Sequence, residues 1–466
     1  MLELSIRQAA EAMHARLGNG PSDDPALGHP FPPVSIDSRT LRQGEAYFAI
    51  LGERHDGHAY LDSAARAGAS LLVVDRTPAV PCLPGIPILQ VEDTTRALQD
   101  LARHLRRLWN RRLVAVTGSM GKTTTREFTA ALLAERLAVL QPKGNFNNHI
   151  GLPLSLTRLE ASHEAAVVEL GMNHPGEIRR LGDICRPDVA LMTNVSAVHL
   201  EFFDSVDAIA RAKGEILESI RPGGCFVYNA DDPRVRSLAD AFEGSKVSFG
   251  FGDEADYRIS KWAIEDFSGV SFRLVGPRLE VNAKLCVVGK HFLYNAAAAI
   301  AVASLFELTE EEIDRGLTRL AAVGGRGTLT RLGNITLWDD SYNSNPGAVE
   351  SVLETIGSLD AVARRVLVLG DMLELGPRGP ELHRQVGMRA GTMADLLVTV
   401  GTLAESLRAG AIQAGLQEDR ALHFASAEEA ADALPAMLQD GDLVVVKASR
   451  GVHLERVVEA ISGGRH

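Results

Sequence analysis

The chain has 466 residues, of which 45% are hydrophobic and 23% are charged, and its formal net charge is −12 at pH 7. This composition is typical of a globular protein, and the acidity weighs against nucleic acid or an anionic membrane surface as the main partner. The length suggests about three domains.

The cysteines and the apolar segments indicate the cellular compartment in which the protein acts. The chain contains four widely spaced cysteines without a Cys-x-x-Cys pair, namely Cys82, Cys185, Cys225 and Cys286. This usage is typical of free or buried thiols in a reducing compartment. The N-terminal stretch 1–18 is charged and helix-periodic, unlike a signal peptide, and the apolar stretch 295–306 is too short and too rich in alanine to span a bilayer. We therefore expect a cytoplasmic protein without stable membrane insertion.

The first 92 residues are predicted to form a small α/β domain. The predicted elements are strands at 34–37, 46–50 and 70–75 and a helix at 58–69. A stretch rich in proline and glycine at 78–87 indicates the approach to a boundary. Ser38 and Arg39 follow the first strand and could bind a phosphate, although a solvated loop would have the same composition.

Residues 93–325 are predicted to form a larger domain with a mainly parallel, doubly wound sheet. The predicted elements are a helix at 95–109 and strands at 112–118, 165–170, 188–193 and 225–229, with helical patterns between the strands. Residues 247–288 alternate more like antiparallel strands. A hinge is predicted at 321–329.

Residues 326–466 are predicted to form a Rossmann-like domain. The predicted elements are strands at 334–340, 364–370, 395–400 and 442–448, which alternate with helical patterns and end in a helix at 451–461. The fold class is therefore predicted to be α/β in three domains.

The stretch VAVTGSMGKTTTRE at 114–127 lies between an apolar strand and an amphipathic helix. A glycine-rich turn in this place points backbone N–H groups at one spot, where the helix dipole favours an anion. Lys122 is predicted to reach the terminal phosphates of a nucleotide, and Thr123 to offer its hydroxyl to Mg²⁺. The nucleotide-binding residues predicted here are Gly118, Ser119, Gly121, Lys122, Thr123 and Thr124. The general P-loop pattern would have a glycine six residues before the lysine, where this chain has Val116.

Three further side chains are candidates for chemistry. Glu169 ends an apolar strand, where ligands of parallel sheets bind, although it could equally be a turn or capping carboxylate. His199 also follows a strand, but a lone histidine is more often structural. Lys213 is notable because only eight of the 48 basic residues are lysines, and an amine can be deprotonated and modified where a guanidinium cannot.

Two polar loops complete the candidates. Residues 144–153 contain Asn145, Asn147 and Asn148, which could bind a polar substrate or only form turns. Residues 339–349 follow the first strand of the last domain, and helix capping by Asn345 explains part of that polar run but not all of it.

Taken together, these stretches resemble the Mur ligase family, ATP-dependent amide ligases of peptidoglycan synthesis. The resemblance runs along the whole chain in the same order and covers residues 35–39, 117–124, 144–153, 169–178, 194–203, 212–216, 339–349, 368–376 and 446–450. The shortened P-loop is the family's own form, which accounts for Val116. The resemblance implies a UDP-binding domain (1–92), a central ATPase domain (93–325) and a C-terminal Rossmann-like domain (326–466).

The resemblance also implies roles for the candidate residues. Lys122 and Thr123 would handle the ATP phosphates and a first Mg²⁺, while Glu169 and His199 would hold a second Mg²⁺. Lys213 would be a candidate for carbamylation, which turns the amine into an oxygen ligand for that metal. The remaining implied contacts are Arg326 with the terminal phosphate, Asp340 and Asn343 with the nucleotide, Ser38 and Arg39 with the UDP part, and Asn145, Asn147 and Asn148 with the sugar-peptide.

One stretch departs from the family pattern. At 287–296 the family often has Gly-Arg-His-Asn, whereas this chain has Lys290 and Phe292 around His291. We therefore do not carry over the adenine contact normally assigned to the Asn after the His, and we predict Asn295 as the nucleotide ligand.

The implied activity is the ATP-dependent joining of D-alanyl-D-alanine to the tripeptide carboxylate of UDP-N-acetylmuramoyl-tripeptide through an acyl phosphate. That reaction serves cell wall biogenesis, and with it cell shape and cell division, and we expect a monomer. Within the family, the alternatives are a ligase that adds the third peptide residue and one that adds glutamate to folate. A ligase for the third residue is not supported, because the chain has no Asp-Asn-Pro-Arg stretch of the kind associated with diaminopimelate recognition. A folate ligase is not supported, because such enzymes are expected to lack the N-terminal domain that bears residues 35–39. A GTP-binding switch protein would need an Asn-Lys-x-Asp motif to read guanine, and this motif is absent. An inactive scaffold is disfavoured because the chain has all five predicted functional side chains, namely Lys122, Thr123, Glu169, His199 and Lys213.

Overall fold

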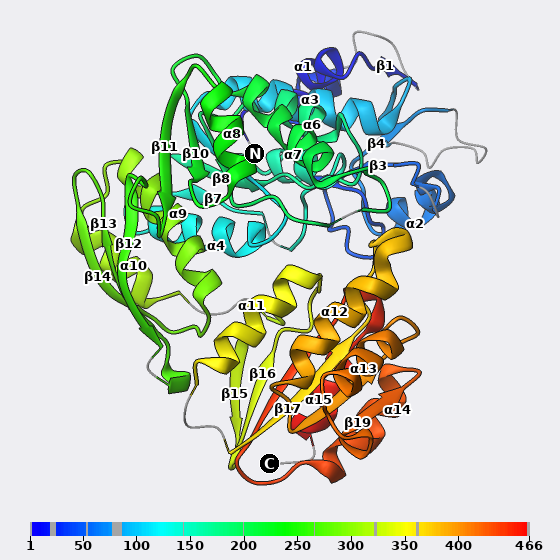
Figure 1. Cartoon of the computed structure of the whole chain (residues 1–466). Helices are drawn as coiled ribbons and strands as arrows, with labels where there is room; N and C mark the ends of the chain where they lie inside the picture. Colours follow the sequence, from blue (N-terminus) through cyan, green and yellow to red (C-terminus); the bar gives the residue numbers. More distant parts are fainter. Residues whose placement is uncertain are drawn as a thin grey trace. The chain divides into compact units, whose positions relative to one another are not determined.

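The computed structural model describes residues 2–18, 25–52, 55–76, 86–142, 144–198, 200–264, 266–320, 324–359 and 363–463. Within these residues the chain forms three sheets (Figure 1). Its contacts group it into two compact units. The first consists of Met1–Thr117, Arg136–Leu191 and Ala212–Phe226, and the second of Gly118–Glu135, Met192–Arg211 and Val227–His466. The predicted domain limits after residues 92 and 325 stay predictions.

The first sheet has the strand order β1-β5-β4-β3-β2. Its strands are β1 (Arg16–Leu17), β2 (Val34–Ser35), β3 (Ala46–Phe48), β4 (Leu71–Val74) and β5 (Ile88–Gln90), with helices α1 (Ile6–Ala12) and α2 (Leu61–Arg66). Strands β2 to β5 pair in parallel and β1 is antiparallel to β5. The helix predicted at 58–69 is shorter than expected, because its first turn is a 3₁₀ helix, Gly57–Tyr60.

Both faces of this sheet are covered, as expected for parallel strands. Phe48, Leu71 and Val73 point into a core shared with α1 and α3 (Thr94–Trp109), whereas Tyr47 and Leu72 pack on the opposite face with residues of α2. Alternate residues of the strands thus fill two separate cores.

The central sheet has the strand order β14-β13-β12-β11-β10-β9-β6-β8-β7. Its strands are β6 (Arg112–Thr117), β7 (Val139–Leu140), β8 (Ala165–Glu169), β9 (Val189–Met192), β10 (Cys225–Asn229), β11 (Ser245–Gly250), β12 (Tyr257–Ile264), β13 (Val270–Val275) and β14 (Glu280–Leu285). The associated helices are α4 (Lys122–Leu133), α5 (Gly151–Leu156), α6 (Glu177–Cys185), α7 (Val206–Gly214), α8 (Pro233–Ala241), α9 (Lys290–Leu305) and α10 (Glu310–Thr318).

Pairing in this sheet changes along its width. Strand β8 is parallel to both β6 and β7. The antiparallel prediction for 247–288 is confirmed for β12, β13 and β14. It is wrong for β11, which runs parallel to β12. The turn between β11 and β12 is held by Asp256, whose carboxylate accepts hydrogen bonds from the backbone N–H and the hydroxyl of Ser248.

The third sheet has the strand order β15-β16-β20-β17-β18-β19. Its strands are β15 (Thr328–Leu332), β16 (Ile335–Asp339), β17 (Arg364–Gly370), β18 (Leu396–Val400), β19 (Ala421–Phe424) and β20 (Asp442–Lys447). Its helices are α11 (Pro346–Gly357), α12 (Gly379–Gly391), α13 (Ala404–Gln413), α14 (Ala427–Ala433) and α15 (Glu455–Gly463). All neighbouring strands pair in parallel except β15, which is antiparallel to β16.

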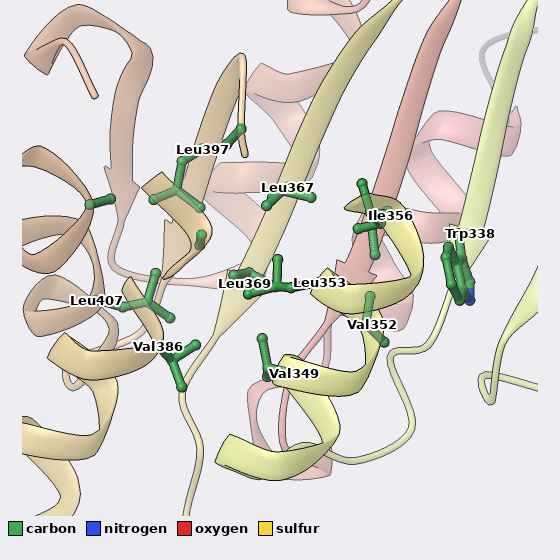
Figure 2. Close-up of a cluster of buried hydrophobic side chains, with 14 of the residues drawn as sticks. Trp338, Val349, Val352, Leu353, Ile356, Leu367, Leu369, Val386, Leu397 and Leu407 are labelled. Carbon is green, nitrogen blue, oxygen red and sulfur yellow. The ribbon is translucent and has the colours of Figure 1, made fainter. Parts of the chain in front are cut away.

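Two cores sandwich the third sheet, as predicted for a Rossmann-like unit. Figure 2 shows one of them, in which Leu367 and Leu369 of β17 face Leu353 of α11 and Val386 of α12. Trp338 of β16 belongs to the same core and is completely buried. The opposite face packs against α14 and α15. The predicted α/β fold class is confirmed by these three sheets.

Among the described residues, no helix combines the length and the apolar character needed to cross a membrane. Cys185 and Cys225 are buried free thiols and Cys286 is an exposed one. Cys82 lies outside the described residues.

Candidate active site

The loop between β6 and α4 contains two glycines that no other residue could replace without strain. Gly118 has φ +144°, and a Cβ atom there would lie 2.0 Å from Oγ1 of Thr193. Gly121 precedes α4 with φ +76°, and a Cβ there would lie 2.6 Å from Oδ1 of Asn295. The tight turn exists because both positions lack a side chain, and it brings the loop backbone to the N-terminus of α4.

Side chains that follow β9 hold this loop in place. Oδ1 of Asn194 accepts a hydrogen bond from the N–H of Met120 (3.0 Å), and its Nδ2 donates to the carbonyl of the same residue (3.1 Å). The Thr193 hydroxyl donates to that carbonyl as well (2.6 Å), and the N–H of Ser119 donates to the carbonyl of Asn194 (2.8 Å). The sequence analysis gave Asn194 no role beyond its place in the stretch 194–203, and the structure shows that it positions the loop.

The predicted phosphate-binding lysine lies over its own loop. Nζ of Lys122 donates hydrogen bonds to the carbonyls of Gly118 (2.9 Å) and Ser119 (3.2 Å). Thr123 and Thr124 begin the helix beside it and are 6% and 7% exposed. An ammonium group and hydroxyls at a helix N-terminus form a donor set that suits a polyphosphate with its Mg²⁺.

Asn295 lies directly against the loop. Its Oδ1 accepts a hydrogen bond from the Thr125 hydroxyl (3.1 Å), and the residue is 5% exposed. Phe292, one turn earlier on α9, is buried and stacks on Phe128 of α4 with ring centroids 6.3 Å apart. The phenyl ring that replaces the family's asparagine is therefore part of the packing between α4 and α9.

In the first unit, the predicted metal ligand and the asparagine loop meet. Nδ2 of Asn147 donates hydrogen bonds to Oε1 of Glu169 and to Oδ1 of Asn145, both at 2.7 Å. Glu169 is the last residue of β8 and only 1% exposed. The third asparagine, Asn148, stabilises the start of α5, because its Oδ1 accepts a hydrogen bond from the N–H of Gly151 (2.8 Å).

Lys213 lies near the end of α7 and is 1% exposed. Its side chain is therefore removed from the solvated surface, and its chemical role stays a prediction. His199 lies outside the described residues. Among the residues described, no three His, Cys, Asp or Glu side chains are grouped so that they could hold a metal. The metal ligands therefore stay predictions, although the oxygens of Glu169 and Thr123 are of the kind that Mg²⁺ prefers.

The loop after β16 contains the predicted nucleotide contacts of the last domain. Nζ of Lys447 donates to Oδ2 of Asp340 (2.5 Å) and to the carbonyl of Asn343 (3.1 Å). Burial raises the pKa of Asp340, and the charge of Lys447 opposes that rise. Arg326 lies between Gly325 and Gly327, and its guanidinium carbon is 3.8 Å from the ring centre of Tyr342.

The predicted UDP contacts lie in the first unit. Arg39 forms a bidentate ion pair with Asp37, with Nε–Oδ1 at 2.9 Å and Nη2–Oδ2 at 2.7 Å. Its hydrogen bond lowers the pKa of the Asp37 carboxyl. Ser38 is half-buried beside it. The Arg39 side chain is 86% exposed and thus accessible to an anionic ligand.

Known families and solved structures match this chain along most of its length. Three family descriptions fit consecutive segments: "Mur ligase family, catalytic domain" at 32–106, "Mur ligase middle domain" at 116–303 and "Mur ligase, glutamate ligase domain" at 325–450. The UDP-N-acetylmuramoyl-tripeptide–D-alanyl-D-alanine ligase of Bacillus subtilis (strain 168) is 33% identical over 98% of both chains. A crystal structure of MurF from Acinetobacter baumannii superposes with a TM-score of 0.88 at 28% identity over 99% of both chains. The MurF ligase of Thermotoga maritima in complex with ADP superposes with a TM-score of 0.81 at 29% identity, covering 93% of this chain and 97% of that one.

Proposed function

Because this chain belongs to the Mur ligase family, we propose that it is an ATP-dependent ligase that joins D-alanyl-D-alanine to UDP-N-acetylmuramoyl-tripeptide. The products are ADP, phosphate and the UDP-pentapeptide used for peptidoglycan. One observation carries the assignment: the similarity to a ligase of this name extends over 98% of both chains. Since the substrates are ATP and a nucleotide sugar, we expect the enzyme to act in the cytoplasm, and we expect a monomer.

The reaction has two steps. The terminal carboxylate of the tripeptide attacks the γ-phosphorus of ATP, so a P–O bond to ADP breaks and an acyl phosphate forms. The amine of D-alanyl-D-alanine then attacks the acyl carbon, loses a proton and expels phosphate. Water would destroy the acyl phosphate, so the site must exclude water while the dipeptide binds.

The first step brings a carboxylate up to a triphosphate, and positive charge must offset their repulsion. The loop N–H groups and Lys122 would bind the phosphates once its ammonium group exchanges the carbonyls of Gly118 and Ser119 for phosphate oxygens. Arg326 would meet the terminal phosphate. Positioning and electrostatics then account for most of the rate enhancement.

Two Mg²⁺ sites are part of the proposal. Thr123 would hold the first, and Glu169, His199 and a carbamylated Lys213 the second. The metals would neutralise charge that develops on the transferred phosphoryl group. Asn147 supports this assignment, because its hydrogen bond to Glu169 orients that carboxylate (2.7 Å) and links it to the loop proposed to bind the sugar-peptide.

The deciding experiment measures phosphate release by the purified chain with ATP, Mg²⁺, UDP-N-acetylmuramoyl-tripeptide and D-alanyl-D-alanine, each omitted in turn. We expect release that requires all of them and a UDP-pentapeptide identified by its mass. Activity with a UDP-dipeptide and a diamino acid, or with folate and glutamate, would instead move the substrate to a sister enzyme of the family. No ATP-dependent ligation with any of these acceptors would overturn the assignment.

A further inference from the structure

Two arginines of the last domain contact one aromatic ring. The guanidinium carbons of Arg326 and Arg450 lie 3.8 Å and 4.9 Å from the ring centre of Tyr342. The three residues come from separate segments, namely the stretch before β15, the loop after β16 and the turn after β20. Because β16 and β20 are parallel neighbours, the loop and the turn leave the sheet at the same edge, where ligands of parallel sheets bind.

Hydrogen bonds join the three segments that bear this arginine–tyrosine cluster. The N–H of Tyr342 donates to the carbonyl of Gly325 (2.9 Å), which sets the position of Arg326 beside it. The hydroxyl of Ser449, next to Arg450, donates to the carbonyl of Ser344 (3.2 Å) and accepts the N–H of Leu373 (2.9 Å). The segments that bear the two guanidinium groups are thus bonded to the loop that bears the ring.

The charges of the cluster are not neutralised by hydrogen bonds. In the part of the chain that the structure describes, the contacts of the Arg326 and Arg450 guanidinium groups are those with the Tyr342 ring, without a hydrogen bond or ion pair. The charge of Arg326 acts to lower the pKa of Asp340, and that of Arg450 acts to lower the pKa of Glu455. These carboxylates are hydrogen-bonded to Lys447 and His453, respectively. Cation–π contact leaves the hydrogen-bond donors of both guanidinium groups available, so the cluster can accept an anion.

We propose that Arg450 binds the C-terminal carboxylate of the dipeptide acceptor, with Tyr342 as the platform that positions it. The inference rests on the proposed function and extends it to a residue with no role so far. The acceptor reacts through its amine and keeps its carboxylate, which needs a cation once water is excluded. A guanidinium group suits this task because it can bind a carboxylate in a bidentate manner.

The cluster also has a suitable spacing. If Arg326 meets the terminal phosphate, the acyl phosphate forms beside it, and the amine of the acceptor must reach that point. Two extended residues span about 7 Å. The carboxylate of the acceptor should therefore bind about one dipeptide length from Arg326. The guanidinium carbons of Arg326 and Arg450 lie 3.8 Å and 4.9 Å from the same ring centre, which allows a separation of that length.

The test combines a substrate change with a mutation. Steady-state rates are measured with D-alanyl-D-alanine and with D-alanyl-D-alaninamide, which lacks the carboxylate, for the unmodified chain, Arg450→Ala and Arg450→Lys. We expect the unmodified enzyme to prefer the acid by about 10- to 100-fold in kcat/KM, as for other hydrogen bonds to charged groups. Arg450→Ala should lose this preference through a higher KM for the acid, with the KM values for ATP and UDP-tripeptide changed less than about twofold, and Arg450→Lys should keep part of it.

Controls separate the outcomes. Arg389→Ala removes an exposed arginine of α12 outside the site and should leave all constants unchanged. Tyr342→Phe should keep the preference for the acid and Tyr342→Leu should weaken it, because the platform needs the ring and not the hydroxyl. Equal use of acid and amide by the unmodified enzyme, or an undiminished preference in Arg450→Ala, would overturn the inference alone. An unmodified chain without ligase activity on the acid would overturn the proposed function as well.

Discussion

Replacement of Lys447 by methionine should destabilise the third sheet, because it leaves the Asp340 carboxylate without its cation. The two side chains are 4% and 15% exposed, and Nζ lies 2.5 Å from Oδ2. The same ammonium group donates to the carbonyl of Asn343 (3.1 Å), so the loop after β16 loses two hydrogen bonds at once. Methionine keeps most of the volume, which limits any cavity.

Removal of one partner from a buried ion pair typically destabilises a protein by about 3–5 kcal/mol. Asp340 keeps some contact with water and a backbone hydrogen bond from Gly327, so we expect a loss at the lower end, about 3 kcal/mol. The loss should also depend on pH. Burial already raises the pKa of Asp340 above its unfolded value of 3.8, and without Lys447 it rises further. A folded state with a raised carboxyl pKa is favoured at low pH and loses that advantage as the pH rises through the folded pKa, so the defect should be larger at pH 8 than at pH 5.

Hydrogen exchange followed by mass spectrometry measures this loss in the full chain without assuming two-state unfolding. Peptides from β16, β17 and β20 should exchange about 100-fold faster at pH 8 in the Lys447→Met variant, which corresponds to about 3 kcal/mol. Lys284→Met is the matched control, because Lys284 is exposed on β14.

The double variant Lys447→Met/Asp340→Asn separates lost charge pairing from lost packing. Removal of the negative charge should restore much of the protection. Unchanged exchange in the single variant would refute the reasoning, and so would a double variant no better than the single one, because the defect would then not arise from the orphaned carboxylate.

Three further predictions concern the site and its surroundings. Lys122→Ala should abolish ATP-dependent phosphate release, and unchanged turnover would contradict the phosphate-binding assignment. Lys213→Ala should lose activity and regain part of it with a short carboxylic acid that replaces the carbamate, whereas full activity without the acid would remove that role. Burial, with a smaller effect from the charge of Lys447, lowers the pKa of His291 to about 3. A base with a lowered folded pKa stabilises the fold above its unfolded pKa of 6.5, so stability should fall by about 1 kcal/mol between pH 7.5 and 5.5, and urea unfolding of His291→Asn should show a smaller fall.

The strands and the P-loop could be predicted because their signals are local. Residues 366–369 and 225–228 are continuous apolar runs, and the structure has strands over the predicted ranges 364–370 and 225–229. Gly118 and Gly121 could be recognised because a left-handed turn before a helix requires glycine. Such features depend on residues that are neighbours in the chain.

Contacts between distant segments could not be predicted. The hydrogen bond from Asn147 to Glu169 joins residues that no sequence pattern links. The hydrogen bond between Met120 and Asn194 joins residues 74 positions apart. Arg450 gave no signal beyond its place in a family motif, because its relation to Tyr342 arises only when β16 and β20 pair. The parallel β11–β12 pair was missed because side-chain alternation reports which residues are buried and not strand direction.

The completely buried Trp338 gives the enzyme an intrinsic optical probe. A Cβ atom at Gly327, next to Arg326, would lie 3.6 Å from the indole Nε1, and this nitrogen has no hydrogen-bond partner among the described residues. An indole in such surroundings emits at short wavelength, and its emission should respond to a change in the backbone beside it. The chain has two other tryptophans, the buried Trp109 (5% exposed) and Trp262 on β12 (39% exposed), so phenylalanine at both positions leaves Trp338 as the single indole. Fluorescence of the unlabelled protein can therefore follow ligand binding near Arg326 in real time.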